Sequence, residues 1–178
     1  MGRQIVLLRG INLGSRNRVA MPALRELLAA AGLDDVRTYL QSGNVVLSSK
    51  LPPERLAREC RRQISGGLGL DIDVVVRTRD ELAAVVRQNP LRKVADNPKR
   101  YQVSFLESEP KAEVVDRLAA ATAESERFVV DGREIYAWHP EGIGRSKLWS
   151  LLAGKALGVT ATARNWTTVM KLLELADA

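Results

Sequence analysis

With 178 residues, the chain is long enough to bury a sizeable hydrophobic core, so folding requires neither disulfides nor a bound metal. Hydrophobic residues make up 46% and charged residues 27% of the chain, and no apolar run reaches the ~20 residues of a membrane-spanning helix. One cysteine (Cys60) and one histidine (His139) exclude a disulfide framework, a structural zinc site, a zincin and a Ser-His-Asp triad with a histidine to spare. The composition therefore excludes a membrane protein and most familiar hydrolytic chemistry.

The charge is unevenly distributed along the chain. The net charge is +6, and 20 of the 27 basic residues are arginine, which favours bidentate contacts with anions. Residues 1–90 carry 14 basic and 9 acidic residues, whereas residues 91–178 carry 13 and 12. This excess in the first half predicts phosphate-bearing partners, and the alternative is a solvated basic surface. The N-terminal segment lacks a small-residue cleavage site, which predicts a cytoplasmic protein.

The first half predicts the order β-α-β-β-α-β-α. Ser42-Gly43 gives a two-residue hairpin signal between the second and third strands, and Thr78 with Glu81 gives a capping box for the last helix. The predicted strands are Gln4–Leu8, Val36–Gln41, Asn44–Ser48 and Ile72–Thr78, and the predicted helices are Pro22–Ala31, a segment from Pro52 past Ile64, and Thr78 to Gln88. The first six elements are the βαββαβ arrangement of ferredoxin-like domains.

The second half repeats this order after a basic connector, residues 89–100. Asp131-Gly132 gives a hairpin signal, and Asn165 is a helix cap. The predicted strands are Tyr101–Leu106, Phe128–Val130, Glu134–Trp138 and Val159–Thr162, and the predicted helices are Pro110–Thr122, Arg145–Leu157 and Asn165–Leu175. The expected fold is therefore α+β, with two tandem ferredoxin-like (βαββαβ) repeats over 1–90 and 91–178, each followed by an extra helix, and mainly antiparallel sheets.

The hairpin signals predict the register of the strands. A two-residue turn at Ser42-Gly43 pairs Leu40 with Val45 and Thr38 with Leu47.

A turn at Asp131-Gly132 places Phe128 and Ile135 on one face, and Tyr136 and Trp138 on the other. Aromatic residues on such a sheet can stack RNA bases. The first strand has no aromatic residue, however, and the outer face of the first sheet is expected to be apolar, so packing is favoured over stacking. The residues expected on that outer face are Val6, Leu8, Val46 and Val75.

Two loops have the composition of an anion site. The first, Arg9–Arg18, combines basic side chains with Gly10 and Gly14, which allow close backbone approach, and with Asn12 and Asn17, which tolerate left-handed conformations.

The second, Gly142–Lys147, leads into a helix, where an anion would gain from free N–H groups and from Arg145 and Lys147; the alternative is that Ser146 only caps the helix. A third segment, Arg164–Thr168, already has its own cap in Asn165.

Two single residues have conventional interpretations. Cys60 shares an apolar helical stripe with Leu56 and Ile64, which predicts a buried thiol. His139 ends a strand with no conspicuous acid beside it, which predicts a surface histidine; a general base is the alternative. No motif indicates a metal or a cofactor.

Six segments together resemble a known family. They are LLRGINLG (Leu7–Gly14), MPALRELLAAAG (Met21–Gly32), VRTYLQSGNVVLSS (Val36–Ser49), VRTRDEL (Val76–Leu82), GIGRSKL (Gly142–Leu148) and RNWTTVMKLLEL (Arg164–Leu175). They resemble the domain of unknown function 1697 family of uncharacterised bacterial proteins, over essentially the whole chain. The resemblance implies a duplicated α+β architecture and brings no established activity, substrate or catalytic residue.

The leading hypothesis for function is a binding protein for a phosphate-bearing partner, with nucleic acid ahead of nucleotide. An alternative is a small-molecule enzyme with an anion site between the two halves, and a third is an adaptor for an acidic protein. The expected ligand-binding residues are Arg9, Gly10, Asn12, Gln41, Ser42, Asn44, Arg145, Ser146, Lys147 and Arg164. No catalytic residue is assigned.

Overall fold

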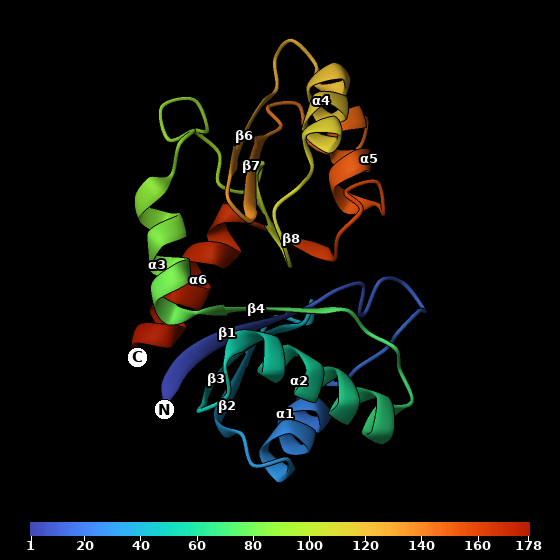
Figure 1. Cartoon of the computed structure of the whole chain (residues 1–178), viewed down its shortest axis with the longest axis vertical. Helices are drawn as coiled ribbons and strands as arrows, with labels where there is room; N and C mark the ends of the chain where they lie inside the picture. Colours follow the sequence, from blue (N-terminus) through green and yellow to red (C-terminus); the bar gives the residue numbers. More distant parts are fainter. The chain divides into compact units, whose positions relative to one another are not determined.

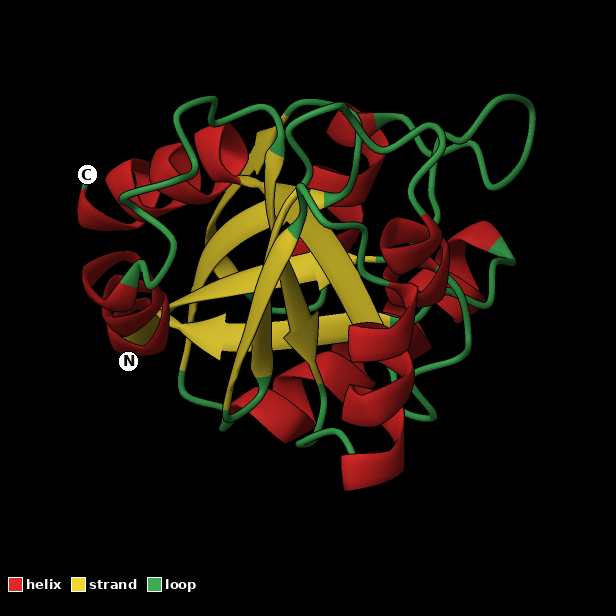
Figure 2. Cartoon of the chain, turned by 90° about the horizontal axis from the view of Figure 1, so that it is seen from above, coloured by secondary structure: helices red, strands yellow, loops and turns green.

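The computed structural model describes residues 1–178 and shows an α+β chain with two four-stranded antiparallel sheets and six helices (Figure 1). The first seven elements are β1 (Gly2–Leu8), α1 (Met21–Ala30), β2 (Asp34–Tyr39), β3 (Asn44–Ser49), α2 (Pro53–Leu68), β4 (Val74–Thr78) and α3 (Arg79–Gln88). The next seven are β5 (Tyr101–Leu106), α4 (Ala112–Ala121), β6 (Arg127–Asp131), β7 (Glu134–Trp138), α5 (Lys147–Ala153), β8 (Ala161–Asn165) and α6 (Trp166–Asp177). The longest loops, residues 9–20 and 89–100, connect β1 to α1 and α3 to β5 (Figure 2). None of the helices is long and apolar enough to cross a membrane.

The chain divides into two compact units, each containing one sheet. Unit 1 comprises residues 1–83 and 172–178, and unit 2 comprises residues 84–171. The helix α3 begins in unit 1 and ends in unit 2, whereas α6 begins in unit 2 and ends in unit 1.

Unit 1 has the strand order β2-β3-β1-β4, with α1 and α2 packed against one face. The core between sheet and helices is formed by every second strand residue together with one stripe of each helix, as the two periodicities require. Leu56, Cys60 and Ile64 of α2 are fully buried in it, as their spacing predicts. At the start of α3, the predicted capping box is present: Thr78 N donates to Glu81 Oε2 (2.8 Å), and Glu81 N donates to Thr78 Oγ1 (3.1 Å).

Unit 2 has the strand order β6-β7-β5-β8, with α4 and α5 against one face. Leu118 of α4 and Leu148 and Leu152 of α5 pack on the strands. The helix α5 is shorter than predicted, because the chain turns to an extended conformation at Gly154 (φ −91°, ψ −162°) instead of continuing to Leu157. At the far end of the chain, Asn165 Oδ1 accepts from Thr168 N (3.0 Å), which confirms the predicted cap of α6.

The β2–β3 turn differs from the prediction. Tyr39 lies opposite Asn44 and Thr38 opposite Val45, so the turn contains four residues, and the predicted pairing of Thr38 with Leu47 is wrong by two positions. Gly43 ends this turn with φ +82°, and a Cβ there would lie 2.6 Å from Leu8 Cβ. Because side chains alternate with period two, a slip of two leaves each residue on its predicted face.

The β6–β7 register also differs from the prediction by two positions, in the opposite direction. Asp131 lies opposite Glu134, so the turn consists of Gly132-Arg133 instead of Asp131-Gly132. Glycine at the first turn position, with φ +58°, is the type II′ arrangement, which fits the twist of a hairpin. Phe128 and Ile135 nevertheless share one face, as predicted.

The second face of each sheet is buried. In unit 1, this face carries Ile5, Leu7, Val46 and Val75, all at most 3% exposed. Val6 and Leu8 were expected there, but they lie in the core under α1 and α2, because they alternate with Ile5 and Leu7. In unit 2, Tyr136 is 1% and Trp138 6% exposed. These rings are packed, as predicted, and are not available for stacking on bases.

Equivalent positions of the two sheets carry matching residues. Gln4 lies opposite Thr78 and Gln102 opposite Asn165, and Thr78 and Asn165 both cap the next helix. One strand position earlier, Arg77 and Arg164 each donate to the preceding carbonyl, at 3.1 and 2.8 Å. Equivalent backbone hydrogen bonds also occur in the two units: Arg9 N donates to Asp73 O (2.9 Å), and Glu107 N donates to Thr160 O (2.8 Å).

Candidate functional site

Unit 2 contains a hollow of about 650 Å³ beside its sheet. One wall is formed by the end of α4 and the turn that follows it (residues 120–126), and the other by the loop that leads into α5 (residues 141–147). This volume lies in the range of small-molecule sites. Three predicted site residues, Arg145, Ser146 and Lys147, line it.

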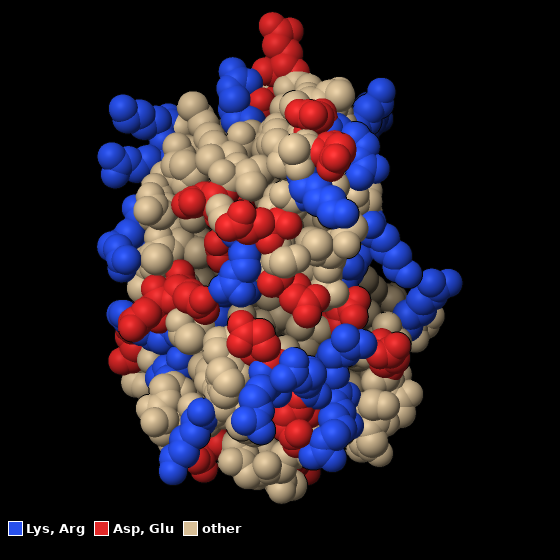
Figure 3. All heavy atoms as spheres, in the orientation of Figure 1, with Lys and Arg blue, Asp and Glu red and all other residues tan.

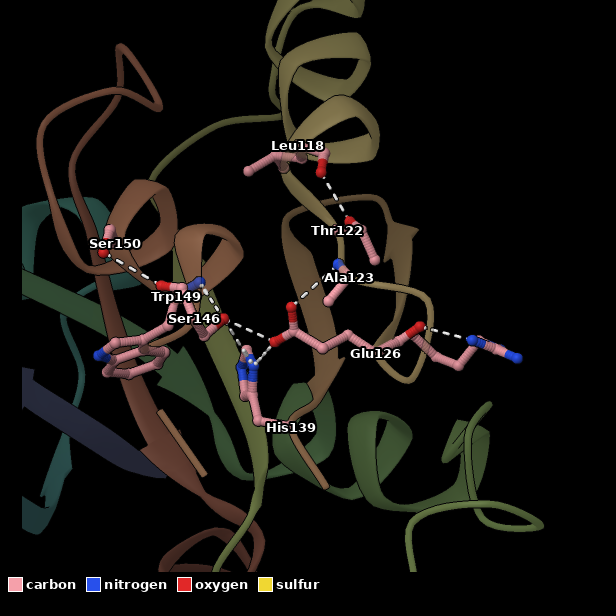
Figure 4. A network of polar contacts seen from close by, with 9 residues as sticks. Leu118, Thr122, Ala123, Glu126, His139, Ser146, Trp149 and Ser150 are labelled. Atoms are coloured by element: carbon pink, nitrogen blue, oxygen red, sulfur yellow. Dashed lines mark hydrogen bonds and ion pairs between the residues drawn. The ribbon is translucent and has the colours of Figure 1, made fainter. Parts of the chain in front are cut away.

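Glu126 is the buried acid of this hollow. It is 6% exposed, and its carboxylate accepts three hydrogen bonds (Figure 4). Oε2 lies 2.5 Å from His139 Nδ1 and accepts from Ser146 Oγ at 2.6 Å, while Oε1 accepts from Ala123 N at 3.1 Å. Burial raises the pKa of Glu126, but the hydrogen bonds from Ser146, His139 and Ala123 outweigh it and hold the pKa below its ordinary value. Glu126 is therefore ionised at neutral pH.

His139 is completely buried beside this acid, so the prediction of a surface histidine without a neighbouring acid is wrong. Because Arg127 lies opposite Trp138 in the β6–β7 hairpin, the next residues outward, Glu126 and His139, face each other. Trp149 packs edge-on against the ring, with 5.8 Å between centroids. The other ring nitrogen, Nε2, is buried without a hydrogen-bond partner.

Ser146 caps α5 and also belongs to the acid cluster. Its Oγ accepts from Trp149 N (3.0 Å) and donates to Glu126, so the predicted capping role is confirmed. Its Oγ lies 3.3 Å from His139 Nδ1, the same nitrogen that faces Glu126. A Ser-His-Asp triad places the serine and the acid on different ring nitrogens, so this cluster is a different arrangement.

The rim of the hollow carries uncompensated charge. Arg145 and Lys147 are exposed, and neither side chain makes a hydrogen bond or an ion pair. The backbone N–H groups of Gly144, Arg145 and Lys147 also have no acceptor. Glu141 adds an exposed carboxylate to the same wall. The loop itself is held in place, because Gly142 N donates to His139 O (2.9 Å) and Arg100 Nη1 donates to Pro140 O.

The loop after β1 has the backbone conformation predicted for it. Gly10, Asn12, Gly14 and Asn17 all have positive φ, between 48° and 68°. The Asn12 side chain, however, bonds within unit 1: Nδ2 donates to Val19 O (2.9 Å) and to Gln41 O (2.6 Å), and Oδ1 accepts from Val19 N (2.8 Å). The structure thus joins this loop to the β2–β3 turn through Asn12.

Two further predicted residues, Asn44 and Arg164, are held by the fold. Asn44 is fully buried, and its Nδ2 donates to Tyr39 O (3.0 Å) and to Ser42 Oγ (2.8 Å). Arg164, in unit 2, is 8% exposed and donates to Thr162 Oγ1 (2.7 Å), and burial lowers its pKa to about 10. Arg9, Gly10, Asn12, Gln41, Ser42 and Asn44 all lie in unit 1.

Cys60 is fully buried, and burial raises the pKa of its thiol to about 12. This confirms the prediction of an unreactive core cysteine. No group of three or more His, Cys, Asp or Glu side chains is arranged to hold a metal ion.

The sequence misses Glu126 for an identifiable reason. With the turn placed one residue early, His139 is paired with Glu124 instead of Glu126. The signal that could identify the pair is Gly132, which marks the first position of a type II′ turn and so sets the register.

Comparison with known proteins identifies the family and the fold. Residues 1–136 match the family described as "Protein of unknown function (DUF1697)". The matched range contains Glu126 and ends before His139 and Ser146. Comparison with the curated proteins finds no match. A solved structure, that of the conserved bacterial protein SP0830 from Streptococcus pneumoniae, is similar over 98% of both chains, with a TM-score of 0.76 and 22% sequence identity.

Proposed function

The chain belongs to the DUF1697 family of proteins of unknown function, and we propose from the geometry of the hollow that it binds a phosphate-bearing ligand there. The observation that supports this most directly is the pair of exposed, unpaired cations, Arg145 and Lys147, beside a cavity of about 650 Å³. A compact ligand is favoured over nucleic acid, because the cations flank a hollow of small-molecule size and the aromatic rings of the sheet are buried.

The loop provides several donors for a phosphate group. An arginine fork and a lysine ammonium can bind different phosphate oxygens, and charge-assisted hydrogen bonds of this kind are short and strong. The free N–H group of Gly144 adds a neutral donor that is already fixed in place. Little ordering is needed when the ligand binds, which favours affinity.

The carboxylates of the hollow indicate which groups, besides phosphate, the ligand carries. Glu126 already accepts three hydrogen bonds, so its charge is well compensated. Glu141 is exposed and can accept hydrogen bonds from hydroxyl or amino groups. A phosphate ester with several hydroxyl groups fits this combination.

Nucleic acid is the second candidate, supported by unpaired arginines of unit 1. Arg16 and Arg18 are exposed in the loop after β1, and Arg55 and Arg58 are exposed on α2; none of these side chains has a partner. Acidic side chains lie among the basic ones on this part of the surface (Figure 3). This mixture weakens the field that would attract a phosphate backbone.

We further propose that residues 1–90 and 91–178 are two ferredoxin-like repeats. The matching positions of Gln4 and Gln102 and of Arg77 and Arg164 support this, as do the equivalent strand orders.

Calorimetric titration with inorganic pyrophosphate and with adenosine 5′-monophosphate tests the binding proposal. We expect Arg145→Ala/Lys147→Ala to weaken binding at least ~10-fold, because each side chain contributes a charge-assisted contact. Lys155→Ala is the matched control, since Lys155 is also exposed and unpaired in unit 2 but lies outside the hollow. Undiminished affinity in the double variant refutes the proposal.

Oligonucleotides distinguish the second candidate. Binding that is lost in Arg16→Ala/Arg18→Ala and falls steeply with added salt supports nucleic acid, because each neutralised phosphate releases counterions.

A further inference from the structure

We propose that Ser146 is a nucleophile, that Glu126 is its general base, and that the hollow hydrolyses carboxylic esters. Four observations on one site support this: a serine at the surface of a cavity, an ionised carboxylate on its hydroxyl, a buried histidine behind the carboxylate, and free N–H groups beside the serine. A nucleophile, its base, an orienting group and oxyanion donors are the parts that acyl transfer requires.

The serine and its base are already in contact. Ser146 Oγ donates to Glu126 Oε2 at 2.6 Å, within the distance at which a proton passes directly. The hydroxyl borders the hollow, where an acyl carbon can approach it. Trp149 N donates to the same Oγ at 3.0 Å, and a hydrogen bond to an oxygen that becomes negative favours loss of its proton.

The base is fixed in orientation. His139 Nδ1 faces Oε2 at 2.5 Å, and Ala123 N donates to Oε1 at 3.1 Å, so the carboxylate cannot turn away from Ser146. These contacts keep Glu126 ionised, which a base must be before it accepts a proton. His139 acts here as a positioning residue.

Donors for the developing oxyanion lie next to the nucleophile. The N–H of Lys147, the residue after Ser146, has no acceptor, and neither has that of Arg145. Fixed backbone donors beside a nucleophile stabilise the negative oxygen of a tetrahedral intermediate.

The reaction balances with water as the only co-reactant. The Oγ of Ser146 bonds to the ester carbonyl carbon while its proton passes to Glu126 Oε2. The ester C–O bond then breaks, and the alcohol leaves with that proton. Water attacks the acyl-serine and gives a proton to Glu126, the acid is released, and Ser146 Oγ recovers the proton.

The scaffold does not require this cluster, as unit 1 shows. His139, the residue after β7, corresponds to Ser49 of β3, by the pairing of Val45 with Val6 and of Ile135 with Ser104. A smaller hollow, of about 370 Å³, lies beside Ser49, but no histidine lines it, and α2 has no side-chain cap. The same architecture therefore folds without a histidine at this position.

The substrate class rests on the proposed function. If Arg145 and Lys147 hold a phosphate, the substrate is a carboxylic ester whose alcohol or acyl part carries that phosphate. The nucleophile is tested separately with an uncharged alkyl fluorophosphonate, which needs no phosphate contact. In that reaction, Ser146 Oγ bonds to phosphorus, the P–F bond breaks, fluoride leaves, and the serine proton passes to Glu126.

The experiment is labelling of the full chain with this probe, followed by intact mass and peptide mapping. We expect one adduct, on Ser146, that is absent in Ser146→Ala and in Ser146→Asn, the latter retaining a helix-capping side chain. We expect Glu126→Gln to label at least ~100-fold more slowly, the lower range for loss of a general base. Ser125→Ala is the matched control and should label at the native rate, because Ser125 lines the same hollow without a carboxylate on its hydroxyl.

Three outcomes overturn the proposal: no adduct on the native protein, an adduct on another residue, or unchanged labelling in Glu126→Gln. None of them bears on pyrophosphate binding, so a failed nucleophile and a failed phosphate site are distinguished. If Ser146 is labelled but pyrophosphate does not bind, the esterase proposal stands and the proposal that its substrate carries a phosphate fails.

Discussion

Replacing Glu126 with alanine tests whether the buried cluster stabilises unit 2. The change leaves three donors without their acceptor: His139 Nδ1, Ser146 Oγ and Ala123 N. Because His139 is fully buried and Glu126 is 6% exposed, water replaces the carboxylate poorly. Removing one member of a buried pair costs ~3–5 kcal/mol, and we expect the free energy of unfolding to fall by about that amount.

Urea denaturation followed by circular dichroism and tryptophan fluorescence measures this loss. Trp149, one of three tryptophans in the chain, contacts the His139 ring, so its share of the emission reports on the cluster. Glu126→Gln retains an oxygen acceptor and should lose less, about 1–2 kcal/mol. Glu124→Ala is the control, because Glu124 is exposed in the same turn, and it should change stability by no more than ~0.5 kcal/mol. A loss below ~1 kcal/mol in Glu126→Ala would refute the argument that the cluster is stabilising.

The same carboxylate predicts how stability depends on pH. Its pKa is lower in the folded than in the unfolded chain, so its contribution to stability is present above the unfolded pKa of ~4.3 and is lost as pH falls through the folded pKa. When native and Glu126→Gln proteins are compared by urea denaturation from pH 3 to 7, their free energies of unfolding should differ least at the acid end. A difference that grows toward low pH contradicts this. A second prediction concerns the β2–β3 turn: Gly43→Ala should destabilise the chain by ~2 kcal/mol more than Gly14→Ala, because both positions have positive φ but only at Gly43 would the Cβ meet another side chain, Leu8 at 2.6 Å. Equal losses in thermal or urea melts would show that backbone strain alone matters at Gly43.

Local signals in the sequence predict most of the fold. The strand of β5 and the buried stripe of α2 follow from periodicity, and the capping box at Thr78 and the cap at Asn165 follow from residues that bond to their own backbone neighbours. These features depend on contacts within a few residues, which the sequence displays directly. The end of α5 at Gly154 was missed, because glycine is tolerated within a helix and only its conformation shows that the helix stops there.

The candidate site was predicted in part. Arg145, Ser146 and Lys147 do border a cavity, since a glycine-rich loop before a helix leaves backbone donors free. For Asn12, the conformational prediction was right, but the same small amide that tolerates positive φ also bonds to Val19 and Gln41 within unit 1. Residue type alone does not distinguish a side chain that binds a ligand from one that organises its own loop.

The missed pair, Glu126 and His139, shows how an error in register affects inference about function. A slip of two positions preserves every face of a hairpin, so the predicted core remains correct and gives no warning. It changes every cross-strand partner, however, and at the open end of β6–β7 it exchanges Glu126 for Glu124. Cores depend on which face a residue occupies, whereas the chemistry of a site depends on which two atoms meet. For that reason, a sequence can predict a hydrophobic core correctly and still miss the acid beside its only histidine.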